Sequence, residues 1–167
     1  MTTTLETARS LAASVLDPEM PMLTLADLGV LRDVRVDEGT VVVTITPTYS
    51  GCPAMATMRA DLEHALTAGG FGDVRVDTTL TPAWSTDWIS AEGRRKLATA
   101  GYSTPGPAPH RPSGPVPLTL TMRPRAIACP QCGSAATEKL SEFAATPCKA
   151  LYRCTACAEP FDHVKEI

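Results

Sequence analysis

Long apolar runs, aromatic residues and a dominant sign of charge are all scarce in this chain of 167 residues. No apolar run is long enough to cross a bilayer, so a membrane-spanning protein is not expected. Aromatic residues make up only 5% of the chain, and its net charge is −3. The first residues lack the cationic and apolar stretches of a secretory leader. We therefore expect a soluble, cytoplasmic protein whose cysteines stay reduced.

Conventional catalytic patterns are missing as well. The chain has no dinucleotide-binding glycine fingerprint and no phosphate loop, and its sequence supports no Ser-His-Asp or Cys-His pairing. Its Lys and Arg residues are interleaved with acids, whereas the phosphate backbone of a nucleic acid requires clustered cations. We expect no nucleic-acid partner, and we expect the chain to assist other proteins rather than to catalyse a reaction alone.

Four cysteines near the C-terminal end have the paired spacing of a tetrahedral thiolate site. A two-residue gap lets the backbone curl around one ion, and two such pairs complete a closed tetrahedron. Zinc in a structural role is favoured, which predicts a zinc ribbon; an iron-sulfur cluster is the alternative, since cysteine-only sites accept either. Two disulfides would suit a secreted chain instead. The pairs are Cys129 with Cys132 in Cys-Pro-Gln-Cys-Gly, and Cys154 with Cys157 in Cys-Thr-Ala-Cys.

A fifth thiol, Cys148, lies six residues before Cys154 and has no place in a closed tetrahedron. Two interpretations stay open: a buried thiol packed with Phe143 and Leu151, or a second functional thiol. His163, with four cysteines already well spaced, is predicted to be a surface residue on the last strand.

A proline-rich segment divides the chain, because six prolines fall within residues 105–117. A chain of this size can hold one compact core and a small satellite domain. We predict an N-terminal domain over residues 1–104, a linker over 105–117 and a zinc-ribbon domain over 118–167.

The periodicity of apolar residues in the first domain alternates between helical and extended patterns. It predicts a small α/β sandwich of the α+β class, in the order helix, strand, strand, helix, strand, helix. The third strand would join the same sheet as the hairpin through a helical crossover. The expected elements are a helix over 3–16, a hairpin over 34–45, a helix over 53–68, a strand over 74–80 and a last helix from Ser85 or Thr86 through Leu97.

Cys52 is the chemically interesting residue of this domain, in Thr46-Pro-Thr-Tyr-Ser-Gly-Cys-Pro-Ala between the second strand and the second helix. Pro53 suits a first helical turn, which would place Cys52 at or beside the N-cap. Unpaired amide groups and the helix dipole there lower the pKa of a thiol. We favour a functional thiol, either nucleophile or metal ligand, over a small buried hydrophobe.

An acidic loop between the first helix and the first strand carries Asp17, Glu19 and Asp27. For Asp17 and Glu19 the favoured interpretation is a turn that satisfies local amide groups. Asp27 lies just before the first strand, at the sheet end where Cys52 also emerges if the hairpin is antiparallel. We therefore take Asp27 as a candidate partner of Cys52 in a catalytic site.

Several of these motifs resemble known families. Asp17-Pro-Glu-Met-Pro with Asp27-Leu-Gly-Val, and the motif around Cys52, resemble the small domain of iron-sulfur assembly factors such as SufT. Pro82-Ala-Trp-Ser-Thr-Asp-Trp-Ile and Cys148-Lys-Ala-Leu-Tyr-Arg-Cys extend the resemblance to the PaaD subunits of the phenylacetate pathway, over almost the whole chain.

The resemblance implies a bacterial accessory or maturation protein of the multicomponent phenylacetyl-CoA epoxidase. Its implied partners are a di-iron oxygenase and a reductase that carries flavin and a 2Fe-2S cluster. It implies that Cys52, with Asp27 beside it, transiently holds iron or an iron-sulfur cluster, and Cys148 is the other candidate cofactor-binding thiol. A symmetric homodimer that shares Cys52 would offer a cluster two thiolates at once.

Two other functions remain open. One is a structural subunit that bridges the oxygenase components without metal transfer. The other is a thiol-redox enzyme, which requires the sulfurs of Cys52 and Cys148 to approach disulfide distance. The chain also departs from the family, because it has Val164-Lys-Glu-Ile where relatives often end in Phe-Lys-Cys, and Ala144-Ala-Thr-Pro where they tend to have Gly-Ser-Thr-Ala.

Overall fold

The computed structural model describes residues 4–109 and 126–167, which belong to two compact units, Met1–Ala100 and Gly101–Ile167. Residues 101–109, which the sequence assigned in part to the linker, belong to the second unit. Residues 110–117 of the predicted linker and 118–125 of the predicted ribbon domain lie outside the described residues. Within the described part of the chain, no helix is both long and apolar enough to span a membrane.

The first unit is built on a three-stranded mixed sheet in the order β1-β2-β3. Its strands are β1 (Leu31–Asp37), β2 (Thr40–Ile45) and β3 (Val74–Thr78). The first two strands form the predicted antiparallel hairpin, and its turn uses Glu38 and Gly39 at positive φ. The crossover through a helix lays β3 in the same sheet as the hairpin, as the sequence predicted, and β3 runs parallel to β2.

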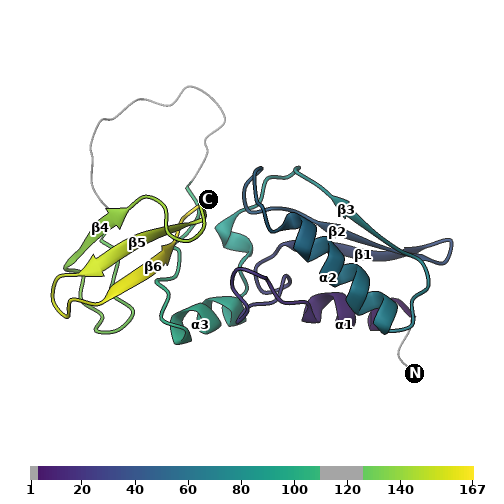
Figure 1. Ribbon diagram of the computed structural model, residues 1–167, viewed down its shortest axis with the longest axis horizontal. Helices are drawn as coiled ribbons and strands as arrows, with labels where there is room; N and C mark the ends of the chain where they lie inside the picture. Colours follow the sequence, from purple (N-terminus) through teal and green to yellow (C-terminus); the bar gives the residue numbers. More distant parts are fainter. Residues whose placement is uncertain (1–3, 110–125) are drawn as a thin grey trace. The chain divides into compact units, whose positions relative to one another are not determined.

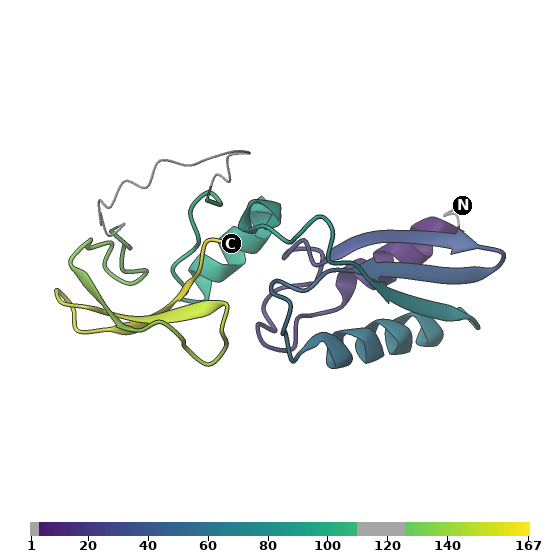
Figure 2. The ribbon, with the colours of Figure 1, turned by 90° about the horizontal axis from the view of Figure 1, so that it is seen from above.

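Two helices cover one face of this sheet (Figures 1 and 2). Helix α1 (Thr4–Ser14) packs against β1, helix α2 (Met55–Ala68) packs against β3, and the helices contact each other. Beneath them a row of valines, Val34, Val43 and Val76, crosses the three strands with at most 3% exposure. The predicted α/β sandwich is confirmed.

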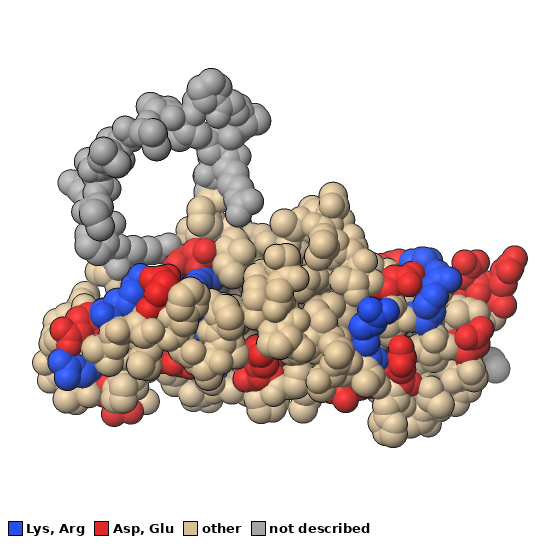
Figure 3. Space-filling view, turned by 45° about the horizontal axis from the view of Figure 1, so that its top comes forward, with Lys and Arg blue, Asp and Glu red and all other residues tan. Residues whose placement is uncertain are grey.

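The opposite face of the sheet carries charged side chains around the buried Val42. Arg35 lies 3.7 Å from Asp33 and 3.9 Å from Asp77, and Arg75 lies 3.2 Å from Asp77. On the side of the molecule drawn in Figure 3, Lys and Arg lie beside Asp and Glu in the same way. Such exposed pairs contribute little stability individually, so the valine layer under the helices is the main source of stability here.

The predicted last helix is in fact two shorter elements. Ser85 caps a 3₁₀ turn, η1 (Thr86–Trp88), and Ser90 caps α3 (Ala91–Thr99) by accepting a hydrogen bond from the Gly93 amide. Ser90 is extended, as an N-cap requires, so the chain cannot remain helical from Ser85 onward. The third strand also ends earlier than predicted, and Leu80 beyond it is 59% exposed.

The second unit is a three-stranded antiparallel sheet, the predicted ribbon. Its strands are β4 (Thr137–Ser141), β5 (Lys149–Cys154) and β6 (Pro160–Val164), in that order. Beside the outer strand β6, the Ser103 amide donates to the carbonyl of Asp162, and the Val164 amide donates to the carbonyl of Ser103. The segment after α3 therefore covers this edge of the sheet.

One glycine of the first unit allows a close contact. Gly29 has a φ of +69°, and a Cβ atom there would lie 2.6 Å from Trp88 Cβ and 2.8 Å from the Trp88 carbonyl oxygen. Gly70 has a φ of +94°, but a Cβ there would meet nothing within 4 Å. Substitution of Gly70 by alanine would therefore cost only the backbone strain of positive φ, whereas substitution of Gly29 would add steric overlap with Trp88.

We expect Gly29→Ala to lower the free energy of unfolding of the first unit by about 2–4 kcal/mol, since it combines backbone strain with overlap. Gly70→Ala should cost only about 1 kcal/mol, the backbone term alone. Urea denaturation followed by tryptophan fluorescence measures both. Equal losses in the two variants would show that the contact with Trp88 does not constrain this position.

Candidate metal centre and thiol loop

The structure brings the four predicted metal ligands together. The sulfur atoms of Cys129, Cys132, Cys154 and Cys157 all lie within 4.8 Å of one another. The Cys129 and Cys157 sulfurs are 3.8 Å apart, and those of Cys132 and Cys154 are 3.6 Å apart. Metal–sulfur bonds of about 2.3 Å in a tetrahedron give sulfur–sulfur edges of about 3.8 Å. The quartet therefore has the size of a four-thiolate metal site.

Backbone turns place each pair of thiols. In the first pair, the Gly133 amide donates to the carbonyl of Cys129, and the Cys129 amide donates to the carbonyl of Ser134. Gly133 is at a φ of +72°, which closes this turn. In the second pair, Cys154 ends β5 and its amide donates to the carbonyl of Glu159.

Cys154 and Cys157 differ in acidity. A backbone hydrogen bond from Cys157, opposed by loss of hydration and aided by a second from Ala156, lowers the pKa of Cys154 to about 7. A backbone hydrogen bond from Glu159 favours the thiolate of Cys157, but loss of hydration and the neighbouring thiols prevail and raise its pKa to about 12. A thiolate at Cys154 would attract a cation, whose binding would displace the remaining protons.

The donor set decides which ion fits. All four donors are sulfur, and Cys129 and Cys154 are buried whereas Cys132 and Cys157 are exposed. A closed set of four thiolates suits zinc and leaves no open position for a substrate. Ile127, Phe161 and the two buried cysteines form one apolar cluster, against which Tyr152 packs. The metal ligands are thus part of the core of this unit.

Cys148 lies outside the quartet and is 7% exposed. Its sulfur is 3.1 Å from the hydroxyl oxygen of Thr146. The burial agrees with the first of the two interpretations drawn from the sequence. Phe143, which that interpretation packed against the thiol, is itself 61% exposed.

His163 is not the surface residue that the sequence suggested, because it is only 3% exposed. Its Nδ1 atom lies 3.0 Å from the hydroxyl oxygen of Ser103, and its Nε2 atom lies 3.4 Å from a carboxylate oxygen of Glu166. It also lines a cavity of about 460 Å³ together with Tyr152. The partner Ser103 is 60 residues away in the chain, so spacing gave no signal for this burial.

Cys52 is half-buried in the turn between β2 and α2. Its amide lies 3.2 Å from the carbonyl oxygen of Tyr49. Helix α2 begins later than predicted, at Met55, and its N-cap is Ala54, which makes no side-chain capping bond. Cys52 therefore precedes the N-cap by two residues and is farther from the helix terminus than its sequence suggested.

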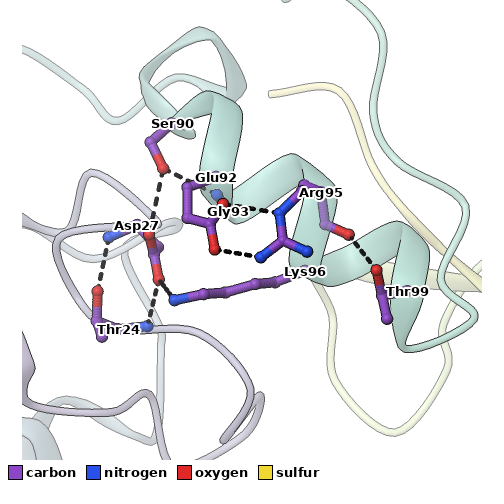
Figure 4. A network of polar contacts seen from close by, with 8 residues as sticks. All are labelled: Thr24, Asp27, Ser90, Glu92, Gly93, Arg95, Lys96 and Thr99. Atoms are coloured by element: carbon purple, nitrogen blue, oxygen red, sulfur yellow. Dashed lines mark hydrogen bonds and ion pairs between the residues drawn. The ribbon is translucent and has the colours of Figure 1, made fainter.

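Asp27 is held by its own turn and by α3 (Figure 4). Its carboxylate accepts hydrogen bonds from the Thr24 amide at 3.1 Å, the Ser90 hydroxyl at 3.3 Å and the Lys96 ammonium at 2.7 Å. Its carbonyl oxygen accepts the Ser90 amide. Partial burial alone would raise the pKa of Asp27, but the hydrogen bonds from Lys96 and Thr24 outweigh it and lower that pKa.

The segments that carry Asp27 and Cys52 leave the sheet at the same end, as the hairpin predicted. Leu31 pairs with Ile45, and the Thr46 amide donates to the carbonyl of Val30. The hydrogen bonds of the Asp27 side chain lead to Thr24 and α3. A catalytic partnership with Cys52 stays a prediction.

Fold and site together define a class of protein: an iron-sulfur assembly domain followed by a zinc ribbon. The family described as iron-sulfur cluster assembly protein matches residues 8–78, and the PaaD zinc beta ribbon domain matches residues 113–165. The first unit also matches a crystal structure of a domain of unknown function, DUF59, from Bacillus anthracis. The TM-score is 0.52 at 26% identity, covering 56% of this chain and 90% of that one.

Two relatives of known name indicate which family within this class the chain resembles. A protein of Escherichia coli, named as a putative subunit of 1,2-phenylacetyl-CoA epoxidase, is 43% identical over 157 residues, covering 93% of this chain and 89% of the relative. An "Fe-S protein maturation auxiliary factor" of Porphyromonas gingivalis is 35% identical over 86 residues, covering 50% of this chain and 81% of the relative. The chain belongs to the PaaD family of epoxidase subunits, which confirms the resemblance seen in the sequence.

Replacing Cys132 by Ala should abolish tight metal binding and unfold the ribbon, because binding of a structural metal supplies folding free energy. The metal content per chain and the amide spectrum of residues 126–167 measure the two effects. Cys148→Ala is the matched control, and it should keep the metal. A folded, metal-loaded Cys132→Ala protein would contradict a four-thiolate site.

Asp27→Asn should lower the free energy of unfolding by about 1–3 kcal/mol at pH 7, since it leaves the Lys96 ammonium without its carboxylate. The lowered folded pKa means that the contribution of ionised Asp27 to stability is full above the unfolded pKa of about 3.9 and is lost as the pH falls through the lower folded pKa. The stability gap between variant and wild type should therefore begin to narrow below about pH 4 and close only below the folded pKa. Glu92→Gln, which removes an exposed pair with Arg95, is the control and should change stability far less. A gap that does not narrow at all as the pH falls well below about 4 would exclude the charge of Asp27 as its cause.

Proposed function

We propose that this protein is an accessory subunit of a phenylacetyl-CoA epoxidase system in the cytoplasm, and that it matures an iron-sulfur centre of a client subunit. Cys52 would be the transient ligand of iron or of a cluster. The observation that carries the proposal is the place of Cys52, half-buried on the turn before α2, in a domain that matches the iron-sulfur cluster assembly family. The relative in P. gingivalis, named as a maturation factor, matches over the length of a single domain.

Cys52 would offer iron or a cluster only one thiolate ligand. An iron-sulfur cluster is held by four ligands, so Cys52 alone provides too few for a stable resident cluster. The other ligands would come from the client, from a small thiol or from a second copy of the chain. A site with one ligand releases its cargo when the client supplies the rest, which is the behaviour that transfer requires.

Asp27 has a positioning role in this proposal. Its carboxylate accepts the Lys96 ammonium and the Ser90 hydroxyl, so it fixes α3 against the loop that precedes β1. The start of β1 pairs with the end of β2, where the Cys52 turn begins. We infer that Asp27 keeps that end of the sheet rigid, and that Cys52 makes the contact with metal.

The ribbon has a separate part. Its four thiolates close a tetrahedron around zinc and leave no position for a further ligand, so we assign it a structural metal and client recognition. Cys148 is buried, and we assign it no transient ligation. The clients that the family suggests are the oxygenase and the 2Fe-2S reductase of the epoxidase.

A second function, from a different class, is a bridging subunit that joins the epoxidase components without transferring metal. The E. coli relative, named as a subunit of the epoxidase, favours it. It predicts stable co-elution with the oxygenase and no response to substitution of Cys52. The two proposals therefore differ in the consequence of a single change.

Cys52→Ala should leave the fold and the ribbon metal unchanged yet produce a client reductase poor in cluster, because the transient ligand is gone. Iron and acid-labile sulfide per flavin in a co-expressed reductase measure the loading, which we expect to fall severalfold. Cys148→Ala is the matched control and should give a loaded client. A fully loaded reductase beside Cys52→Ala would refute the transfer role and favour the bridging function.

A further inference from the structure

Among the exposed arginines of the described residues, Arg32 alone stacks on an aromatic ring. Arg35, Arg75, Arg95 and Arg153 each pair with a carboxylate, whereas Arg9 and Arg59 donate to the backbone carbonyls of Val34 and Val76. Arg32 is exposed, and within residues 4–109 and 126–167 the structure shows no carboxylate bound to it. Its guanidinium carbon instead lies 3.6 Å from the centroid of the Trp88 ring, and its Nη1 atom lies 3.4 Å from the carbonyl oxygen of Gly29. A fixed cation thus has no acidic partner in this part of the chain.

The ring under this cation is held firmly. Trp88 ends η1, where its amide donates to the carbonyl of Ser85, and two residues later the Ser90 amide donates to the carbonyl of Asp27. Gly29 has no Cβ, and only that absence allows the backbone of Trp88 to approach so closely. Trp88 is therefore a rigid platform for the guanidinium group.

The strand under Arg32 is irregular at this point. The register of β1 against β2 shifts between Leu31 and Asp33, the position of Arg32. A bulge of this kind redirects a side chain out of the regular alternation of a strand. Stacking on the indole uses the face of the guanidinium and Nη1 donates to the Gly29 carbonyl, so the other in-plane N–H groups are those that can form a fork to a carboxylate.

The Arg32–Trp88 pair lies at the functional end of the sheet. Arg32 follows Leu31, which pairs with Ile45 at the end of β2. The chain then continues from Ile45 into the turn that carries Cys52. A protein that engages the pair would approach the end of the domain from which the thiol emerges.

The chemistry favours a protein surface over a free anion. A lone exposed cation gains only about 0–1 kcal/mol from an ion in water. Where a partner excludes water, however, Arg and Trp are among the residues that dominate binding. Residues 1–104 hold eight Lys and Arg against thirteen Asp and Glu, a net charge of −5, so long-range attraction of an acidic partner is absent and the cation acts at short range.

We propose that the Arg32–Trp88 pair is a docking point that receives a surface carboxylate of the client protein next to the Cys52 turn. The proposal rests on the proposed function, because the client is the protein whose iron-sulfur centre is matured. A single bidentate contact at this point would fix the register of the client against the thiol.

The test uses the full chain and the purified reductase and oxygenase components as probes, with affinities measured by biolayer interferometry at several salt concentrations. Arg32→Ala should weaken binding of the client about tenfold or more. Arg32→Lys should lose most of that affinity too, because lysine keeps the charge but neither stacks nor forms a fork. Arg35→Ala, on the same strand and already paired with two aspartates, is the matched control and should bind as the wild type does.

Three results would overturn the docking point. They are an Arg32→Ala protein that binds every component as tightly as wild type, an equal loss in Arg35→Ala, and no binding of either component to wild type. Urea denaturation of the variants shows whether an affinity loss comes from misfolding. The transfer role is tested separately, because Cys52→Ala should bind the client normally and fail only in loading it.

Discussion

The first unit depends on the attachment of one loop, residues 24–30, to the segment that follows the sheet. Asp27 makes this attachment twice, through a carboxylate that accepts Lys96 and a carbonyl that accepts the Ser90 amide. The Leu28 carbonyl accepts the indole N–H of Trp84 at 2.9 Å, and Gly29 admits Trp88. Three consecutive positions of the loop thus hold the chain that ends in α3. Without them the sheet would keep its helices but lose the layer at the end where the Cys52 turn begins.

The second unit is stabilised in a different way. Among residues 101–109 and 126–167, its buried apolar cluster has only a few members, and two of them, Cys129 and Cys154, belong to the four-thiol metal site. Since so small a core supplies little stability, the thiolate–metal bonds must supply much of the rest. The two units therefore respond to different conditions: removal of metal acts on the ribbon, and loss of a buried charge acts on the assembly domain.

The sequence predicted what local spacing determines. The two Cys-x-x-Cys pairs located the metal site, and the alternating valines on either side of Asp37-Glu38-Gly39 located the hairpin. Sequence patterns gave the wrong exposure for His163, because its burial depends on a residue distant in the chain. Its hydrogen-bond partner Ser103 lies 60 residues away. Sequence patterns also merged η1 and α3 into one helix, because the apolar periodicity continues through both. In the structure Ser85 and Ser90 each cap the start of a separate element. The role proposed for Cys52 depends on a client, which no pattern in this chain specifies.

The strand-like contact of Ser103 with β6 sets the minimal length of an independently folding ribbon. A fragment beginning at residue 113, where the ribbon family match starts, would contain all four thiols. It would nevertheless leave the backbone groups on the outer edge of β6 without the Ser103 hydrogen bonds, and the buried His163 imidazole without its hydroxyl partner. An exposed strand edge can pair with other chains, and an unsatisfied buried polar group destabilises the folded state. The excisable module therefore begins near Gly101, and a shorter fragment would tend to aggregate even when saturated with zinc.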